Sequence, residues 1–342
     1  MSLSFNLIKT SEKSLRLGRL TLIKNHEQKV LDTPNCLAYT SRGCVPHLTP
    51  DNLSSIPLNG AIIVTLEHFI DVQPPPSTQF PYGIHKFLNF EEYIVFIDVH
   101  DPGNLKPKSN NTDKHVSVYT VHGVRQPDIF ASLADNITDE APSVKRVKRS
   151  VDRTLRWLDD AINHIKESTQ VFGVLTGHKN QEERIRSAQE TAKRNVAGFV
   201  LNGKCLGSTS RECIDILKSS INHLPSNKPR LAYGLGTPED ILLGVSEGID
   251  LFDTSYALEM TNAGNAFVFS LDIKDDIDSF NRQQIISLWD VNYRNDVRPL
   301  LAGCQCYSCK NHTRAYVHHL LNTHEMLATS QFIPLHGIFQ EY

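Results

Sequence analysis

Short apolar runs and amphipathic stretches alternate along most of the chain. The apolar runs 171–175, 198–202 and 231–236 have the length of β-strands. Each is followed by a stretch with helical character, at about 180–194, 210–224 and 237–248. Strands that alternate with helices predict parallel βα units, either in an open sheet or in a closed barrel.

The segment 143–167 predicts the longest amphipathic helix. Its apolar residues recur at steps of four, four, three, four and three, which places them on one face. These residues are Val147, Val151, Leu155, Leu158, Ile162 and Ile165. Ser143 precedes them in the position of an N-cap.

The run GTPEDILLGVSEGIDLFD (236–253) predicts a capped helix followed by a strand. Thr237 stands at the N-cap and Asp240 three residues later, where the acid of a capping box lies. Gly248 ends the helix, and the strand 249–253 ends in Asp253. A polar residue at the C-terminal end of a barrel strand faces the active-site mouth, whereas helix capping is the alternative role for Asp253.

Composition describes an ordinary globular chain. The 342 residues are 40% hydrophobic and 21% charged, and the formal net charge of −3 gives no global reason for nucleic-acid binding. The apolar runs 61–66 and 93–99 are too short to span a bilayer, and the N-terminus lacks a signal-peptide core. We therefore expect no targeting or anchoring segment. Proline, asparagine and serine predict loops over 73–83 and 104–114.

Three of the seven cysteines are clustered. Cys36, Cys44, Cys205 and Cys213 are scattered, as small buried or surface thiols are. Cys304, Cys306 and Cys309 follow a C-x-C-x2-C pattern, which can supply three of the four ligands of a tetrahedral zinc ion. An unmetallated thiol cluster is the alternative.

The fourth ligand is not decided by the local pattern. Spacing alone favours His312, three residues after the last clustered cysteine. More distant candidates are His318, His319, His324 and His336. A helix over about 312–329 would run ~27 Å, so a ligand beyond it requires the chain to double back, and Pro334 could break the helix there.

The run CQCYSCKNHTRAYVHHLLNTHEML (304–327) resembles the zinc subdomain of the tRNA-guanine transglycosylase family. Residues 229–253 and the helix SVDRTLRWLD (150–159) are similar to two further motifs of that family. The resemblance implies an α/β fold, a (β/α)8 barrel of TIM type over residues 1–300, and a zinc-binding subdomain over 301–342.

The same resemblance implies one zinc ion per subunit. Its ligands would be Cys304, Cys306, Cys309 and His336, with His312 as the local alternative. His336 lies 27 residues after Cys309, one more than the family spacing. The chain stops six residues after His336, where the family continues with further helices, so we expect a shortened subdomain.

The family exchanges a guanine base in the tRNA anticodon for a queuine-type base, using one aspartate as nucleophile and another for proton transfer. Asp253 matches the nucleophile. The family continues with C-V-x-P-T-R, but here the chain reads TSYALE (254–259), so that Glu259 replaces a phosphate-facing arginine.

The other motifs of the chemistry are altered too. Residues 61–73 contain no D-S-G-G-[FY]-Q run, and Glu67 is the nearest acid. The purine-recognising loop G-G-L-A-V-G-E is replaced by residues 202–208, with Ser208 in place of its glutamate. A strand ending in acidic residues is not found between about 133 and 143.

We therefore interpret Asp253 as a vestigial nucleophile. The resemblance implies a non-catalytic subunit that pairs with a catalytic queuine tRNA-ribosyltransferase subunit in a heterodimer. The pair would replace guanine by queuine at the wobble position of tRNAs with GUN anticodons, which gives queuosine. The alternatives are an active transglycosylase that uses Asp253, and a zinc-stabilised RNA- or protein-binding barrel.

A basic cluster is a candidate tRNA contact. Its members are Lys145, Arg146, Lys148 and Arg149, and a solvated helix face is the alternative interpretation. The family association implies a cytoplasmic protein, with peripheral association at the cytoplasmic face of the mitochondrial outer membrane.

Overall fold

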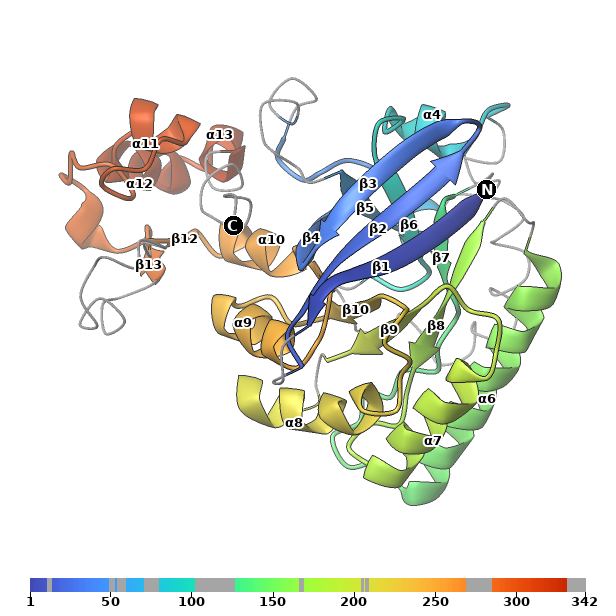
Figure 1. Ribbon diagram of the computed structural model, residues 1–342. Helices are drawn as coiled ribbons and strands as arrows, with labels where there is room; N and C mark the ends of the chain where they lie inside the picture. The colour runs from blue at the N-terminus through green and yellow to red at the C-terminus, as the bar shows by residue number, and fades with distance from the viewer. Residues whose placement is uncertain are drawn as a thin grey trace. The chain divides into compact units, whose positions relative to one another are not determined.

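Eight parallel strands close into a barrel in the computed structural model (Figure 1), in the order β10-β11-β4-β5-β6-β7-β8-β9. The strands are β4 (Asn35–Tyr39), β5 (Ala61–Thr65), β6 (Ile94–Asp98), β7 (Ile129–Ala131), β8 (Gln170–Leu175), β9 (Gly198–Asn202), β10 (Arg230–Tyr233) and β11 (Leu251–Asp253). The structure describes residues 1–10, 14–48, 53, 60–70, 80–101, 127–165, 169–203, 206, 209–268 and 285–330. The predicted barrel of TIM type is confirmed.

The barrel strands are buried on both faces. Every residue of β5, β6 and β7 is buried, as expected for a parallel sheet covered by helices. Phe96 and Phe172 pack edge to face with ring centroids 5.4 Å apart. Gly198 makes room for this pair, because a Cβ atom there would lie 2.5 Å from the Phe172 ring.

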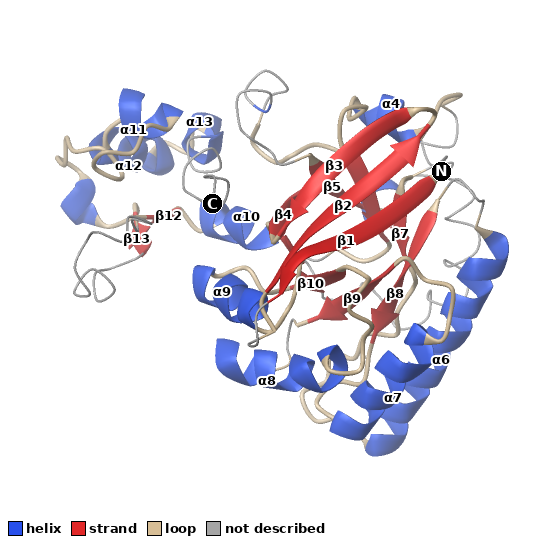
Figure 2. Cartoon of the chain, in the orientation of Figure 1, coloured by secondary structure: helices blue, strands red, loops and turns tan. Residues whose placement is uncertain are grey.

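Helices cover the outside of the barrel (Figure 2) at the places that the periodicity predicts. They are α6 (Val144–His164), α7 (Gln181–Ala192), α8 (Ser210–Ile221) and α9 (Pro238–Ser246), and two short helices, α2 (Glu67–Ile70) and α4 (Ile84–Leu88), lie earlier in the chain. In α6 the predicted face is buried from Val147 to Leu158, and Ser143 Oγ accepts a hydrogen bond from the Arg146 amide at 3.2 Å.

The capping box of α9 is complete. Thr237 Oγ1 accepts from the Asp240 amide at 3.0 Å, and Asp240 Oδ2 accepts from the Thr237 amide at 3.1 Å. Gly248 follows the helix with φ +84°, a backbone conformation that favours glycine. The predicted beginning and end of this helix are therefore confirmed.

An antiparallel sheet of three strands precedes the barrel and was not predicted from the sequence. It consists of β1 (Ser2–Thr10), β2 (Arg16–Lys24) and β3 (Glu27–Thr33), in the order β1-β2-β3. One end of β2 binds the barrel through Asp128, which lies just before β7. Lys24 Nζ is 2.8 Å from Asp128 Oδ1, and His85 Nε2 is 2.7 Å from Oδ2.

The other end of β2 binds a second buried carboxylate, Asp250, which lies just before β11. Arg16 Nε is 3.2 Å from Asp250 Oδ1, and the Arg230 amide donates to Oδ2 at 2.8 Å. Burial raises the pKa of Asp250 to about 6, although Arg16 opposes that shift. Two buried carboxylates at the N-terminal ends of barrel strands thus each receive a cation from one strand of the sheet.

The chain divides into two compact units. The first contains residues 1–44 and 59–255, and the second contains residues 45–58 and 256–342. Elements from residue 255 onward are α10 (Ser255–Asn262), β12 (Asn265–Phe267), β13 (Ile285–Ser287), the 3-10 helix η2 (Val291–Tyr293), α11 (Tyr307–Asn311), α12 (Arg314–Asn322) and α13 (Met326–Ser330).

A small apolar core holds the second unit together. Its buried members are Ala266, Ile286, Leu288, Leu300, Val317, Leu320, Leu321 and Ala328. This packing groups β12 and β13 with the cysteine segment, whereas the domain division at residue 300 stays a prediction. The single helix predicted over about 312–329 is wrong, because the chain turns after α12 and His324 adopts φ +56°.

The two predicted loops and the absence of an anchoring segment concern other parts of the chain. Residues 73–79 and 104–114 of the two predicted loops lie outside the described residues. In the part of the chain that the structure describes, no helix combines the length and the apolar character needed to cross a membrane.

Asp128 should contribute measurably to stability. Burial acts to raise its pKa, but hydrogen bonds from His85 and Lys24 outweigh burial and lower it to about 2, from 3.8. Because the folded-state pKa is depressed, the contribution, ~2 kcal/mol, is present above pH 4 and is lost as pH falls toward 2. We expect Asp128→Asn to lower the free energy of unfolding at pH 7 by about 3 kcal/mol, measured by urea denaturation.

Asp32→Asn is the matched control, because Asp32 pairs with Arg19 on the same sheet but both side chains are at least half exposed. It should cost about 0.5 kcal/mol or less. Equal losses in the two variants would contradict the role of the buried carboxylate.

Candidate functional site

Asp253 lies at the C-terminal end of β11 and is only 1% exposed. Its Oδ2 accepts a hydrogen bond from the Gly234 amide at 2.9 Å, and its Oδ1 accepts from the Ser255 amide at 2.8 Å. The carboxylate therefore stands at the barrel mouth and also binds the first residue of α10. Both oxygens have backbone partners, so the side chain is held in one orientation.

A tyrosine and an aspartate occupy the mouth beside it. The Tyr39 hydroxyl, at the end of β4, donates to Asp101 Oδ1 at 2.8 Å, and His68 Nε2 lies 3.1 Å from Oδ2. The Tyr39 amide donates to Thr254 Oγ1 at 2.9 Å. Burial raises the pKa of Tyr39, and the neighbouring Asp101 raises it further, so the phenol stays protonated and donates.

A second acid–tyrosine pair lies at the ends of β6 and β10. Burial raises the pKa of Asp98 to about 6, with His100 opposing the shift. Burial and Asp98 together raise the pKa of Tyr233 well above its ordinary value. His100 Nδ1 lies 3.1 Å from Glu67 Oε1, so the acid singled out in the sequence is engaged by a histidine.

Asp98 and Asp101 were missed in the sequence, although a signal for Asp98 exists. Asp98 lies near the end of the apolar run 93–99. Asp253 likewise lies at the end of the apolar run 249–253. The strand-end rule that selected Asp253 would therefore have selected Asp98 as well.

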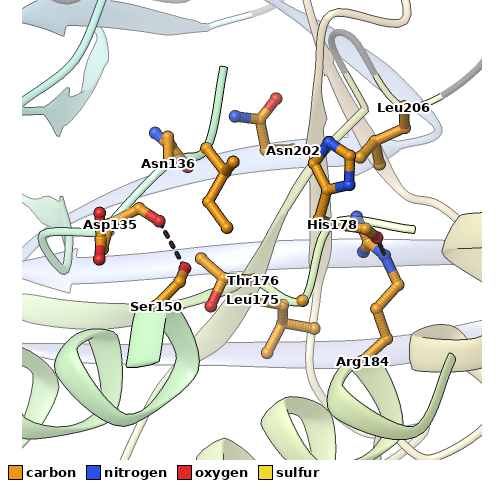
Figure 3. Close-up of a pocket in the computed structure, with 11 residues that line it drawn as sticks. Asp135, Asn136, Ser150, Leu175, Thr176, His178, Arg184, Asn202 and Leu206 are labelled. Atoms are coloured by element: carbon orange, nitrogen blue, oxygen red, sulfur yellow. Dashed lines mark hydrogen bonds between the residues drawn. The ribbon is translucent and has the colours of Figure 1, made fainter. Parts of the chain in front are cut away.

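The opposite side of the mouth contains a pocket at the ends of β7, β8 and β9 (Figure 3). Its lining residues are Asp135, Asn136, Ile137, Ser150, Leu175, Thr176, Gly177, His178, Arg184, Asn202 and Leu206. No acidic strand end was found between 133 and 143 in the sequence, but β7 lies slightly earlier and Asp135 follows it. The strand has only three residues, which is too short to give a periodic signal.

Asp135 is bound by two arginines of α6. Arg146 Nη1 and Nη2 each lie 2.8 Å from one carboxylate oxygen, and Arg153 Nη1 lies 2.9 Å from Oδ2. The Ser150 hydroxyl donates to the Asp135 carbonyl at 2.6 Å. Because a bidentate arginine pair saturates a carboxylate, little acceptor capacity is left for a base in the pocket.

The predicted basic cluster divides into two kinds of residue. Lys145, Lys148 and Arg149 are exposed on α6. Arg146 is half-buried and is committed to Asp135. Contact of this cluster with RNA stays a prediction.

The three clustered cysteines come together in the second unit. The Sγ atoms of Cys304, Cys306 and Cys309 all lie within 4.8 Å of one another. The Leu301 amide donates to Cys309 Sγ and the Cys309 amide to Cys306 Sγ, each at 3.4 Å. Thiolates about 2.3 Å from a tetrahedral ion would be about 3.8 Å apart, so this group could hold a metal ion.

These contacts do not identify the fourth ligand of the metal ion. His336 lies outside the described residues. His312 stacks on Tyr316 with ring centroids 5.1 Å apart and does not join the group of three sulfurs. His318 Nδ1 lies 2.8 Å from the Leu288 carbonyl oxygen and is used in packing. The ligand assignment stays a prediction.

Comparison with known proteins decides the family. The family model described as queuine tRNA-ribosyltransferase matches residues 11–336. The chain belongs to this family. Membership confirms the resemblance found in the motifs, and a queuine tRNA-ribosyltransferase fold accounts for both the barrel and the cysteine cluster.

Three relatives carry the same name, queuine tRNA-ribosyltransferase accessory subunit 2. The human protein is 34% identical over 92% of this chain and 88% of its own length. The Ixodes scapularis protein is 35% identical over 94% and 90%, and the Danio rerio protein is 33% identical over 92% and 87%.

Proposed function

We propose that this chain is the non-catalytic accessory subunit of a heterodimeric queuine tRNA-ribosyltransferase. A catalytic subunit would carry out the exchange of guanine for queuine at the wobble position of tRNAs with GUN anticodons. This chain would hold that subunit in its active form and contribute to tRNA docking. The names of the relatives and the family fold support the proposal. Its location in the cell stays a prediction.

The hydrogen bonds and the burial of Asp253 support the proposal that this chain is not catalytic. A nucleophile must present an oxygen to the ribose, but here both oxygens accept backbone hydrogen bonds and the side chain is 1% exposed. In sequence, α10 follows with exposed Glu259 where the family carries a cation. Loss of one acid–base group alone costs ~10²–10⁴ in rate.

The isolated chain should not incorporate labelled guanine into tRNA, whereas its complex with a catalytic subunit should. We expect the isosteric variant Asp253→Asn, checked for folding by circular dichroism, to support the complex within about twofold of wild type, because the chemistry lies on the other subunit.

Two results would favour the alternatives. Incorporation by the isolated chain that disappears in Asp253→Ala would show an active enzyme. Failure to co-purify with a catalytic subunit would favour an unrelated binding module.

We further propose that the clustered cysteines bind one structural zinc ion, with His336 as the fourth ligand. Three thiolates are the soft donor set that zinc prefers in structural sites. The ion would fix the loop around residue 304 to α11 and α12, and structural zinc can contribute ~10–16 kcal/mol to such a module. In the family this module lies at the dimer interface, so metal binding would support pairing.

Metal analysis by inductively coupled plasma mass spectrometry should find one zinc per chain. Cys309→Ser and His336→Ala should each lose it, because each removes a ligand. His312→Ala and Cys44→Ser are the matched controls and should keep it. Zinc that survives Cys309→Ser would contradict the site, and loss in His312→Ala alone would reassign the fourth ligand.

The exposed cations of α6 are proposed to bind tRNA phosphates. Charge reversal at Lys145, Lys148 and Arg149 together should reduce the slope of log Kd against log salt by about one for each phosphate that is no longer neutralised. Arg156→Glu on the same helix is the control, because Arg156 is also exposed but lies about 10 Å further along the axis. An unchanged slope in the triple variant would indicate a solvated face.

A further inference from the structure

Arg184 is buried in the first turn of α7 without an acidic partner among the described residues. It is 2% exposed, and its Nε donates to the His178 carbonyl at 2.5 Å. Its Nη1 is buried and has no hydrogen-bond partner. Burial lowers the pKa of Arg184 to about 10, which leaves the guanidinium charged at neutral pH.

The other buried arginines of the first unit have a carboxylate nearby, although nitrogens of Arg16 and Arg230 are also buried without a hydrogen-bond partner. Arg16 pairs with Asp250, and the same carboxylate attracts the Arg230 guanidinium. An uncompensated buried charge costs several kcal/mol, and buried charges in proteins are normally paired. A group outside the described chain that supplies negative charge would remove that cost.

The arginine reaches the pocket at the ends of β7, β8 and β9. Gly177 adopts φ +129°, and a Cβ atom there would lie 2.8 Å from both the amide nitrogen and Cγ of Arg184. The turn after β8 therefore packs directly on the stem of the arginine. Figure 3 shows His178, Asn202 and Asn136 around the same space, so three strand ends contribute polar side chains to it.

The charge balance of this pocket favours an anion over a neutral base. Asp135 also lines it, but Arg146 and Arg153 both bind that carboxylate. Adding Arg184 gives three cations around the pocket against two carboxylates, because Asp139 also acts electrostatically on His178. A site that recognises a purine needs acceptor groups with free capacity, and Asp135 has little left because it already accepts three hydrogen bonds from arginines.

We propose that this pocket binds an oxyanion of the phosphate class. The Arg184 guanidinium would donate to the ligand, and the His178 and Asn202 side chains, which also line the pocket, would lie beside it. An arginine fork matches the oxygens of a phosphate group. The ligand is either free phosphate or a backbone phosphate of tRNA. The site depends on the barrel alone and does not require the accessory role.

Equilibrium dialysis of the full-length chain against radiolabelled inorganic phosphate, at constant ionic strength in chloride, tests the proposal. We expect one saturable site per chain with Kd of about 1 mM or below. Arg184→Gln keeps a donor for the His178 carbonyl but removes the charge, and it should weaken binding at least about tenfold. Lys179→Gln, an exposed cation beside the pocket, is the control and should change binding less than about twofold.

Wild-type dialysis keeps the test decisive even if Arg184→Gln fails to fold. Absence of a saturable site on the wild-type chain would overturn the proposal. Unchanged phosphate binding by a folded Arg184→Gln variant, verified by circular dichroism, would also overturn it. Asn202→Ala provides a second variant, for which we expect binding to weaken about threefold or more.

Competition identifies the source of the phosphate group. Displacement of labelled phosphate by tRNA would indicate that a backbone phosphate occupies the pocket. Retention of labelled phosphate in saturating tRNA would indicate a free small anion, and either result supports the site. Failure of the accessory proposal would appear in the base-exchange assay and would leave the dialysis unchanged.

Discussion

Pairing of the last barrel strand with the first is the constraint on which the rest of this molecule depends. β11 pairs in parallel with β4, with Phe252 opposite Cys36 and Asp253 opposite Leu37. The hydrogen bond from the Tyr39 amide to Thr254 Oγ1 joins residues 215 positions apart in the sequence. Because all eight strands run in the same direction, closure brings every C-terminal strand end to one rim. The acids, tyrosines and polar pocket residues meet for that reason.

The two rims of the barrel treat buried charge differently. At the N-terminal rim, Asp128 and Asp250 receive cations from the added sheet. At the C-terminal rim, Asp101, Asp135 and Asp253 are each held by groups of the barrel's own strands, loops and helices. A catalytic rim needs acids that can turn to a substrate, so the internal hydrogen bonds of these acids support the proposed non-catalytic role. Arg184 differs from these groups, because no described carboxylate pairs with it.

The sequence predicted elements whose signal is local. The apolar face of α6 and the capping box of α9 are both set within a few turns of helix, and both were found. The first sheet was missed although β2 alternates between buried and exposed positions. One of its buried positions is the charged residue Arg16, so the sequence does not show a continuous apolar face. β7 was missed because it has only three residues.

The site was predictable only in part. Asp253 followed from its place at a strand end, and the cysteine cluster from its spacing. The binding of Asp135 by the arginines of α6 depends on the path of the loop between β7 and α6, and no residue pattern in the sequence predicts that path. Arg184 lies in a stretch that is polar nearly throughout, so its burial follows from the packing of Gly177 and not from periodicity.

The attachment of β2 to the barrel also limits how this protein can be dissected. A fragment that began at β4 would contain every barrel strand, yet the buried carboxylates Asp128 and Asp250 would each lose a cation. We therefore expect the smallest stable fragment of the barrel to include the preceding sheet. A chimera that exchanges barrels between family members would have to transfer residues 1–33 together with the barrel strands whose buried carboxylates they pair with.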